Sequence, residues 1–100
     1  MKIKLSTPLK ELDGKELKLE QSVFTLGKAI GNILASGTKE SVKDPLKAYI
    51  LASKFHEQEE IDIDESDFLM VREMIVASAR YSVIITGQIL LLLNSIKDSK

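Results

Sequence analysis

The first twenty residues alternate between apolar and polar side chains, which is the period of a half-buried β-strand. Ile3 and Leu5 each follow a lysine, and residues 16–19 repeat the alternation. An Asp-Gly dipeptide, typical of turns, lies between the two runs at positions 13–14. The pattern predicts a small β-hairpin-like element over residues 2–19, with a long connection between its strands.

From Val23 onward, apolar residues recur at a helical period, and start and stop signals divide this region into four helices. The first predicted helix closes at Ser36 and Gly37 with a C-cap glycine, and Thr25 or Ser22 can serve as its N-cap. Its apolar stripe consists of Leu26, Ile30, Ile33 and Leu34.

Two glycines lie inside this first helix, where each costs about 1 kcal/mol relative to alanine. Gly27 and Gly31 are four residues apart and share a face with Ala35. Two interpretations stand side by side. The face either allows another backbone to approach closely, or the helix is weak and is held by tertiary packing.

A polar link over residues 38–43 follows the first helix. The second helix is then predicted to begin with Asp44 as its N-cap and Pro45 as its first helical residue. The second helix is predicted to end near His56, with an inward stripe of Leu46, Ala48, Tyr49, Ile50, Ala52 and Phe55. The run Ile61-Asp62-Ile63 alternates and can form a third strand. The third helix, capped by Asp64 or Ser66, directs inward Phe68, Leu69, Val71, Met74, Ile75 and Ala79.

After a break at residues 80–82, the segment Tyr81–Ile96 is apolar around most of its circumference. It is shorter than the roughly 20 apolar residues needed to span a bilayer. A helix of this kind covers a core with one face and leaves apolar side chains on the other, which favours association. The sequence therefore predicts a homodimer, or a complex with another protein, through this helix, with the interface candidates Ile85, Ile89, Leu91, Leu92 and Leu93.

The chain has 100 residues, with 14 basic and 15 acidic side chains and no cysteine. The length predicts one domain, with a β element over 1–20, a helical region over 23–96 and a frayed tail over 97–100. The balanced charge gives no electrostatic reason to expect nucleic acid or an anionic membrane as a partner. The lack of cysteine excludes disulfides and thiolate chemistry, and the N-terminus lacks the apolar stretch of a secretory signal. We expect a soluble protein of the cytoplasm.

An acidic cluster begins at Asp62, and its oxygen-bearing residues match several ligand positions of a calcium-binding EF-hand loop, with Glu73 at the twelfth. The sixth position is Asp67, where the loop requires glycine, so these acids are interpreted as helix caps. His56, the single histidine, is interpreted as a helix-end residue, and neighbouring glutamates as a solvated linker. We predict no catalytic, cofactor-binding or metal-binding residues, and hence no enzyme activity.

Five short motifs follow one another along the chain. They are Leu-Asp-Gly-Lys at 12–15, Thr-Leu-Gly at 25–27, Lys-x-Tyr-x-Leu-Ala-x-Lys at 47–54, an acidic-apolar run at 61–64, and Gly-Gln-x-x-x-Leu-Leu at 87–93. In these motifs and their order, the chain resembles a family of short uncharacterised proteins of tailed phages and prophages. It departs from them in its longer terminal leucine run. The resemblance implies a phage-related protein made in the cytoplasm of a bacterial host, and it implies no activity.

The sequence thus predicts an α+β fold, mainly helical, with four helices and a small N-terminal β-hairpin-like element. The expected function is that of a non-enzymatic phage or prophage accessory protein, which acts by contact with itself or another protein. That protein could be an assembly component or a host or defence protein. The alternative is a small DNA-associated regulatory protein, for which the salt dependence of DNA affinity is the discriminating measurement.

Overall fold

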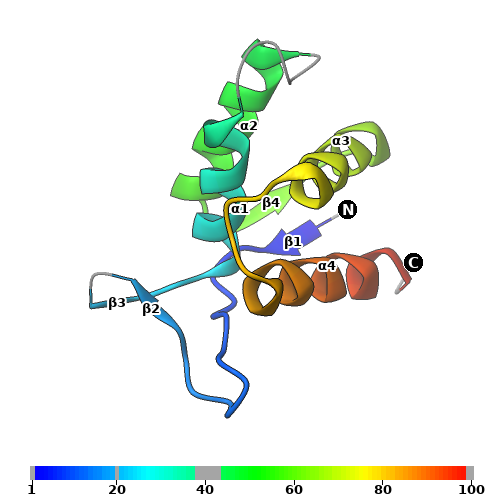
Figure 1. Ribbon diagram of the computed structural model, residues 1–100. Helices are drawn as coiled ribbons and strands as arrows, with labels where there is room; N and C mark the ends of the chain where they lie inside the picture. Colours follow the sequence, from blue (N-terminus) through cyan, green and yellow to red (C-terminus); the bar gives the residue numbers. More distant parts are fainter. Residues whose placement is uncertain (1, 20, 38–43, 99–100) are drawn as a thin grey trace.

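The computed structural model describes residues 2–19, 21–37 and 44–98, which contain four helices and four short strands (Figure 1). The α+β class, mainly helical with a small amount of β structure, is confirmed. The predicted link over 38–43 lies outside the described residues, as do the last two residues of the predicted tail. The elements are β1 (Lys2–Lys4), β2 (Lys18–Leu19), β3 (Ser22–Val23), α1 (Leu26–Ser36), α2 (Pro45–Glu57), β4 (Glu60–Asp62), α3 (Glu65–Ala77) and α4 (Val83–Asp98).

The first strand, β1, pairs antiparallel with β4. Ile3 lies opposite Ile61 in this pair and both side chains are buried, whereas the residues on either side of them are exposed. The N–H of Leu5 donates to the carbonyl of Glu59 at 2.8 Å, which extends the pairing by a step. The predicted third strand is therefore confirmed. The predicted pairing of the first strand with residues 16–19 is wrong, because the strand that pairs with β1 is β4.

A loop over residues 8–17 turns at the predicted Asp-Gly dipeptide. Gly14 has a φ of 89°, in the left-handed region that glycine adopts most easily. The N–H of Leu17 donates to the carbonyl of Leu9 at 2.8 Å. The N–H of Leu9 in turn donates to the carbonyl of Phe24 at 2.9 Å. A hairpin-like element therefore exists, but it lies largely within the segment predicted to be the connection. Beyond it, β2 and β3 form a short antiparallel hairpin that projects from the helices (Figure 1).

Helix α1 begins and ends at the predicted signals. Thr25 is its N-cap, and the Thr25 Oγ1 accepts a hydrogen bond from the N–H of Lys28 at 3.3 Å. The alternative cap, Ser22, belongs to β3. Gly37 occupies the C-cap position with a φ of −69°, so the left-handed conformation expected of a C-cap glycine is not used there.

The two glycines inside α1 face the other elements at very short range. A Cβ added at Gly27 would lie 2.6 Å from the carbonyl oxygen of Phe55 and 2.8 Å from the Cβ of Leu5. A Cβ added at Gly31 would lie 3.3 Å from the carbonyl oxygen of Ala52. The close-approach interpretation of this face is confirmed for both glycines. Ala35 is exposed and does not share in the contact.

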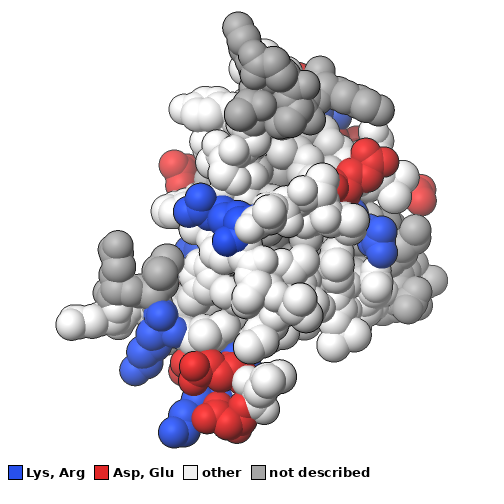
Figure 2. Space-filling view, viewed as in Figure 1, with Lys and Arg blue, Asp and Glu red and all other residues white. Residues whose placement is uncertain are grey.

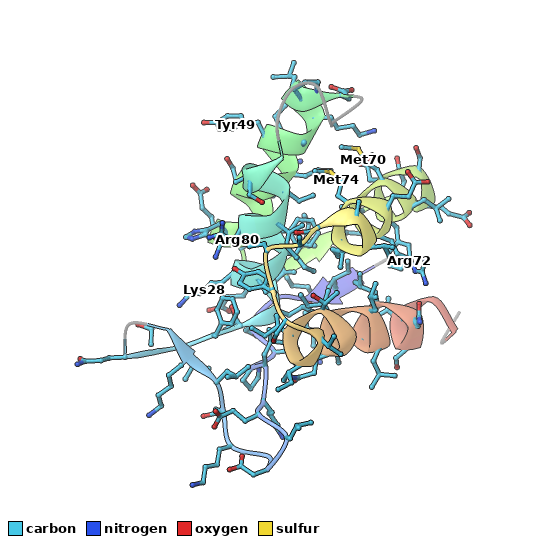
Figure 3. The ribbon with its side chains drawn as sticks, viewed as in Figure 1. Lys28, Tyr49, Met70, Arg72, Met74 and Arg80 are labelled. Atoms are coloured by element: carbon cyan, nitrogen blue, oxygen red, sulfur yellow. The ribbon has the colours of Figure 1, made fainter. Side chains whose placement is uncertain are left out.

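Helices α2 and α3 bury narrower stripes than predicted. On α2 the buried residues are Ala48, Leu51, Ala52 and Phe55, and on α3 they are Phe68, Val71 and Ile75. The predicted inward positions of Leu46, Tyr49, Ile50, Leu69 and Ala79 are wrong, because all five are exposed. Tyr49 projects away from the core in Figure 3. The glycines of α1 hold α2 so close that one seam of α2 is covered and its flanks are left to solvent.

Helix α4 closes one side of the core and lies alongside β1 and α3 (Figure 1). It is preceded by Tyr81, whose hydroxyl accepts a hydrogen bond from Asn32 Nδ2 at 3.0 Å and whose ring meets the Phe24 ring edge-on, with centroids 5.5 Å apart. These contacts hold the turn between α3 and α4 against α1. The helix continues to Asp98, two residues past the predicted end. The buried centre of the core is formed by Ile3, Leu5, Leu9, Leu26, Ile30, Phe55, Phe68, Val71, Ile75, Ile89 and Leu93.

Candidate interaction surface

Over residues 83–95, the side of α4 that faces away from the core carries no charged side chain, and its exposed aliphatic residues are Val83, Ile84 and Leu91. Ile89 and Leu93 are fully buried and mark the centre of the inward side. At a period of 3.6 residues per turn, the opposite side is centred on Gly87 and Leu91. We define the α4 face as the exposed residues on that side: Val83, Ile84, Gly87, Leu91, Asn94 and Ser95.

Two of the apolar members of the α4 face expose most of their surface. Val83 is 86% exposed and Leu91 is 70% exposed, while Ile84 between them is 39% exposed. Scattered single exposed apolar residues are ordinary, but adjacent ones on a single helix face form a patch. In Figure 2 the surface over α4 is white along most of its length, so charged side chains are few there.

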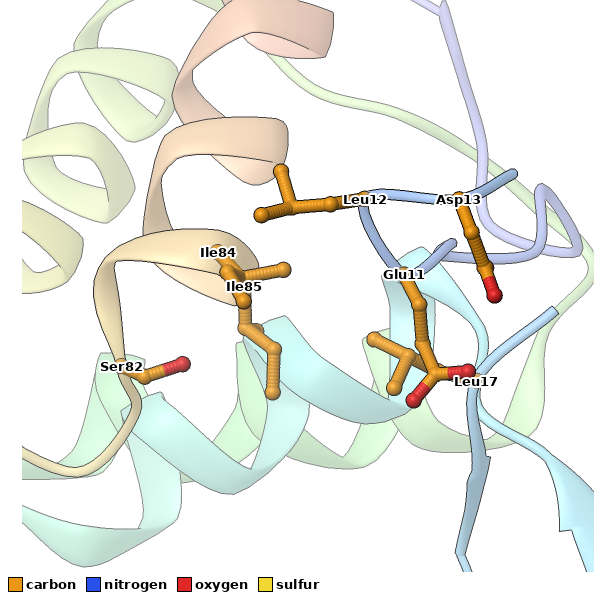
Figure 4. Close-up of a pocket in the computed structure, with 7 residues that line it drawn as sticks. All are labelled: Glu11, Leu12, Asp13, Leu17, Ser82, Ile84 and Ile85. Carbon is orange, nitrogen blue, oxygen red and sulfur yellow. The ribbon is translucent and has the colours of Figure 1, made fainter. Parts of the chain in front are cut away.

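A groove adjoins the N-terminal end of the α4 face. It has a volume of about 370 Å³ and lies between the 8–17 loop and the first turn of α4. Leu12, which is 89% exposed, projects from the loop on the side of Ile84 and Ile85 (Figure 4). Two carboxylates, Glu11 and Asp13, border the loop side. The lining residues are Glu11, Leu12, Asp13, Leu17, Ser82, Ile84 and Ile85.

The side chain of Gln88 fastens the loop to α4 and so fixes the shape of the groove. Gln88 Oε1 accepts a hydrogen bond from the N–H of Lys10 at 2.8 Å. Gln88 Nε2 donates to the carbonyl oxygens of Lys10 and, at 3.0 Å, of Ile84. A side-chain amide thus satisfies both backbone polar groups of Lys10, as a neighbouring strand would.

The structure separates the five predicted interface residues. Leu91 lies on the α4 face, and Ile85 and Leu92 are half-buried at its flanks. Ile89 and Leu93 are fully buried in the core of the chain, so their selection as interface residues is wrong. They were indistinguishable in the sequence because leucine or isoleucine fills every position from 89 to 93.

Sequence reasoning missed Val83, Ile84 and Gly87 as members of the surface. The signal that could have found this side of the helix is Gly87, which interrupts the apolar run. It lies seven residues after Arg80 and four before Leu91, which are spacings that keep residues on one side of a helix. Leu12 was also missed, because its motif was interpreted as a turn alone.

The other side chains that could take part in chemistry are not members of the α4 face, but one of them, Arg72, borders it. Lys47 of α2 pairs with Asp67 of α3, and this hydrogen bond raises the pKa of Lys47 above its ordinary 10.5. Arg72 extends from α3, and its Nε donates to Asn94 Oδ1 at 3.4 Å, at the edge of the face (Figure 3). His56 is exposed in the last turn of α2, as predicted.

The acidic cluster after β4 caps a helix. Asp64 is the N-cap of α3, and its Oδ1 accepts a hydrogen bond from the N–H of Asp67 at 2.7 Å. Because α3 begins at Glu65, an EF-hand loop that starts at Asp62 would have to use helical backbone for most of its length. Within the described residues, no three His, Asp or Glu side chains are grouped so that they could hold a metal ion.

Comparison with known proteins gives no family for this chain: no family model matches it, and neither a curated protein nor a solved structure is significantly similar to it. Among the helices that the structure describes, none combines the length and apolar character needed to cross a lipid bilayer.

Proposed function

We propose that this protein is a non-enzymatic binding module that contacts a protein partner through the α4 face and the adjoining groove. The observation that carries the proposal is the exposure of Val83 and Leu91 on a helix whose opposite side is fully buried. Apolar patches of this kind on a small domain are typical of protein interaction sites.

The character of the surface favours a protein over a nucleic acid. The six residues of the α4 face include no lysine or arginine. Contacts to a phosphate backbone are made largely by these two residue types, and they dominate the affinity for DNA. An apolar helix face of this kind matches the apolar anchor residues of a protein partner.

The biological setting that we propose is a bacterium that carries or is infected by a tailed phage. The resemblance of the five short motifs to those of phage and prophage proteins supports this setting. In it, the protein would act in the bacterial cytoplasm as an accessory protein, by stoichiometric contact rather than by catalysis.

The experiment is a pull-down from phage-infected cells with three tagged forms of the protein: the parent, Leu91→Glu and Leu46→Glu. Leu46 on α2 is 68% exposed and so provides a matched control for Leu91. Both variants are expected to fold, because each new carboxylate lies in solvent. We expect Leu91→Glu to lose the captured proteins and Leu46→Glu to retain them. Equal capture by all three forms, or a loss confined to Leu46→Glu, would contradict the proposal.

A further inference from the structure

The tip of the 8–17 loop is a closed turn that carries two carboxylates beside the groove. The N–H of Glu11 donates to the carbonyl of Lys15 at 2.8 Å, and the N–H of Gly14 donates to the carbonyl of Glu11 at 2.9 Å. The Oδ1 of Asp13 accepts a hydrogen bond from the N–H of Lys15 at 3.0 Å. Together with the hydrogen bonds from Gln88 to the base of the loop, these contacts form the loop side of the groove in advance of any partner.

The groove has aliphatic walls and an acidic rim. Four aliphatic side chains form the walls, two from the loop and two from the first turn of α4. Both charged residues that line the groove, Glu11 and Asp13, are acidic. Figure 4 shows Glu11 on the loop side, with Ile84 and Ile85 on the other side. An occupant of the groove therefore meets aliphatic groups and negative charge together.

The chain does not supply a cation to this rim. Lys10 and Lys15 belong to the same loop, but neither of them lines the groove. Within the part of the chain that the structure describes, the Glu11 carboxylate makes no hydrogen bond or ion pair, and Asp13 uses one oxygen for the turn. A partner that covers the groove removes water from these two acids. This costs free energy unless the partner brings a positive charge.

A lysine or arginine side chain matches both parts of the groove. Each has an apolar stem and a charged end, so the stem can lie along aliphatic walls while the charge stays at the rim. The groove volume of about 370 Å³ is near the lower end of the range of ligand pockets, roughly 300–1,000 Å³, which suits one long side chain rather than a whole helix. The rim would repel an anionic group, and an uncharged side chain would leave the two acids uncompensated.

We infer that the groove binds a lysine or arginine side chain of the partner protein, with its stem between the loop and α4 and its charge at Glu11 and Asp13. Ile84 belongs both to the groove and to the α4 face. The partner segment therefore carries a basic residue next to the apolar residues that meet the α4 face. This inference rests on the proposed function and names the chemistry of the partner.

The experiment titrates the isotope-labelled protein, followed by NMR, with three capped peptides of the sequence Ala-Leu-X-Leu-Ala. The residue X is arginine, citrulline or glutamate, and citrulline matches arginine in length and shape but is uncharged. We expect the arginine peptide to shift the amide signals of Leu12, Leu17 and Ile85. It should bind about fivefold more tightly than the citrulline peptide, as an ion pair near the surface allows. The glutamate peptide should bind most weakly.

Two variants assign this preference to the groove. The double variant Glu11→Gln with Asp13→Asn removes both charges of the rim, and asparagine keeps an oxygen that can accept the N–H of Lys15. Glu16→Gln removes an exposed acid of the same loop that does not line the groove, and it is the matched control. The preference for arginine should disappear in the double variant and persist in the control. In the parent it should also decrease as salt is added, because surface charges are screened.

Three outcomes would overturn the inference: equal binding of the arginine and citrulline peptides, no binding of either at millimolar concentration, or a preference that the double variant retains. If one of these is found and Leu91→Glu still loses the captured proteins, the proposed function stands and the groove is not a site for a basic side chain. If the preference behaves as expected and Leu91→Glu captures as the parent does, the groove binds a basic side chain and the proposed role of the α4 face is wrong.

Discussion

The side-chain amide of Gln88 forms hydrogen bonds with both the N–H and the carbonyl of Lys10, across 78 positions of sequence. These hydrogen bonds hold the 8–17 loop against α4 and so keep the shape of the groove between the loop and the helix. The bond from Lys10 N–H measures 2.8 Å, which is typical of a well-formed hydrogen bond.

Replacement of Gln88 by alanine should release the loop. We expect a loss of about 1–2 kcal/mol in the free energy of unfolding, because three exposed hydrogen bonds are removed, two of them to Lys10. Amide hydrogen exchange at Lys10 should become faster. Exchange at Ile30 in α1 should change only as much as the free energy of global unfolding changes. Gln88→Glu is a sharper test, since a carboxylate can still accept from the Lys10 N–H but cannot donate to its carbonyl. Unchanged protection of Lys10 in both variants would show that the loop is held by other contacts.

Alanine at the two glycines of α1 should give very different results. In Gly27→Ala the new methyl group would meet the backbone carbonyl of Phe55, which cannot move independently of α2. We expect a destabilisation of about 3 kcal/mol, at the upper end of the usual cost of overpacking. In Gly31→Ala the nearest backbone atom is 3.3 Å away, and a gain in helix propensity of about 1 kcal/mol offsets the contact. Urea unfolding of the two variants would measure the difference, and equal stabilities would contradict the close packing of α1 on α2.

The cap of α3 predicts how the acidic cluster responds to mutation and to calcium. Asp64→Ala should lower the free energy of unfolding by about 1 kcal/mol, while Asp64→Asn should change it little, since asparagine is also a good N-cap. A ligand that binds the folded state must raise the melting temperature. We expect calcium not to bind, so millimolar calcium should leave the melting temperature of the parent unchanged. A rise of several degrees that is lost in Asp64→Asn would mean that the cluster binds the ion.

The pair Lys47–Asp67 predicts a pH dependence at the alkaline end. The hydrogen bond to Asp67 raises the pKa of Lys47 above 10.5 in the folded state. The charged form therefore stabilises the fold fully at pH values below 10.5, and this contribution is lost as the pH rises through the raised folded-state pKa. The stability difference between the parent and Lys47→Met should be constant from neutral to mildly alkaline pH and should shrink above pH 10.5. A difference that is independent of pH throughout would show that the Lys47 charge does not act through Asp67.

The sequence alone determined the features that depend on a few neighbouring residues. Asp44 was predicted as an N-cap, and Thr25 and Asp64 were each one of two predicted candidates. Each of these three residues accepts a hydrogen bond from the N–H three residues later. The turn at Gly14 and the approximate ends of the four helices follow from the same kind of local signal. Such signals succeed because both partners of each interaction lie within one turn of the chain.

The tertiary structure alone decided which segments meet and which faces they bury. Alternation marked Ile3 as a strand residue but carried no information about its partner, which is Ile61. The apolar circumference of α4 had no polar side to set its orientation, so Leu93 in the core and Leu91 in solvent looked alike. Gly27 and Gly87 are both glycines inside a helix, yet Gly27 lies against a backbone and Gly87 faces open space. The physical reason is that burial depends on the position of distant elements, which the local period of a sequence does not contain.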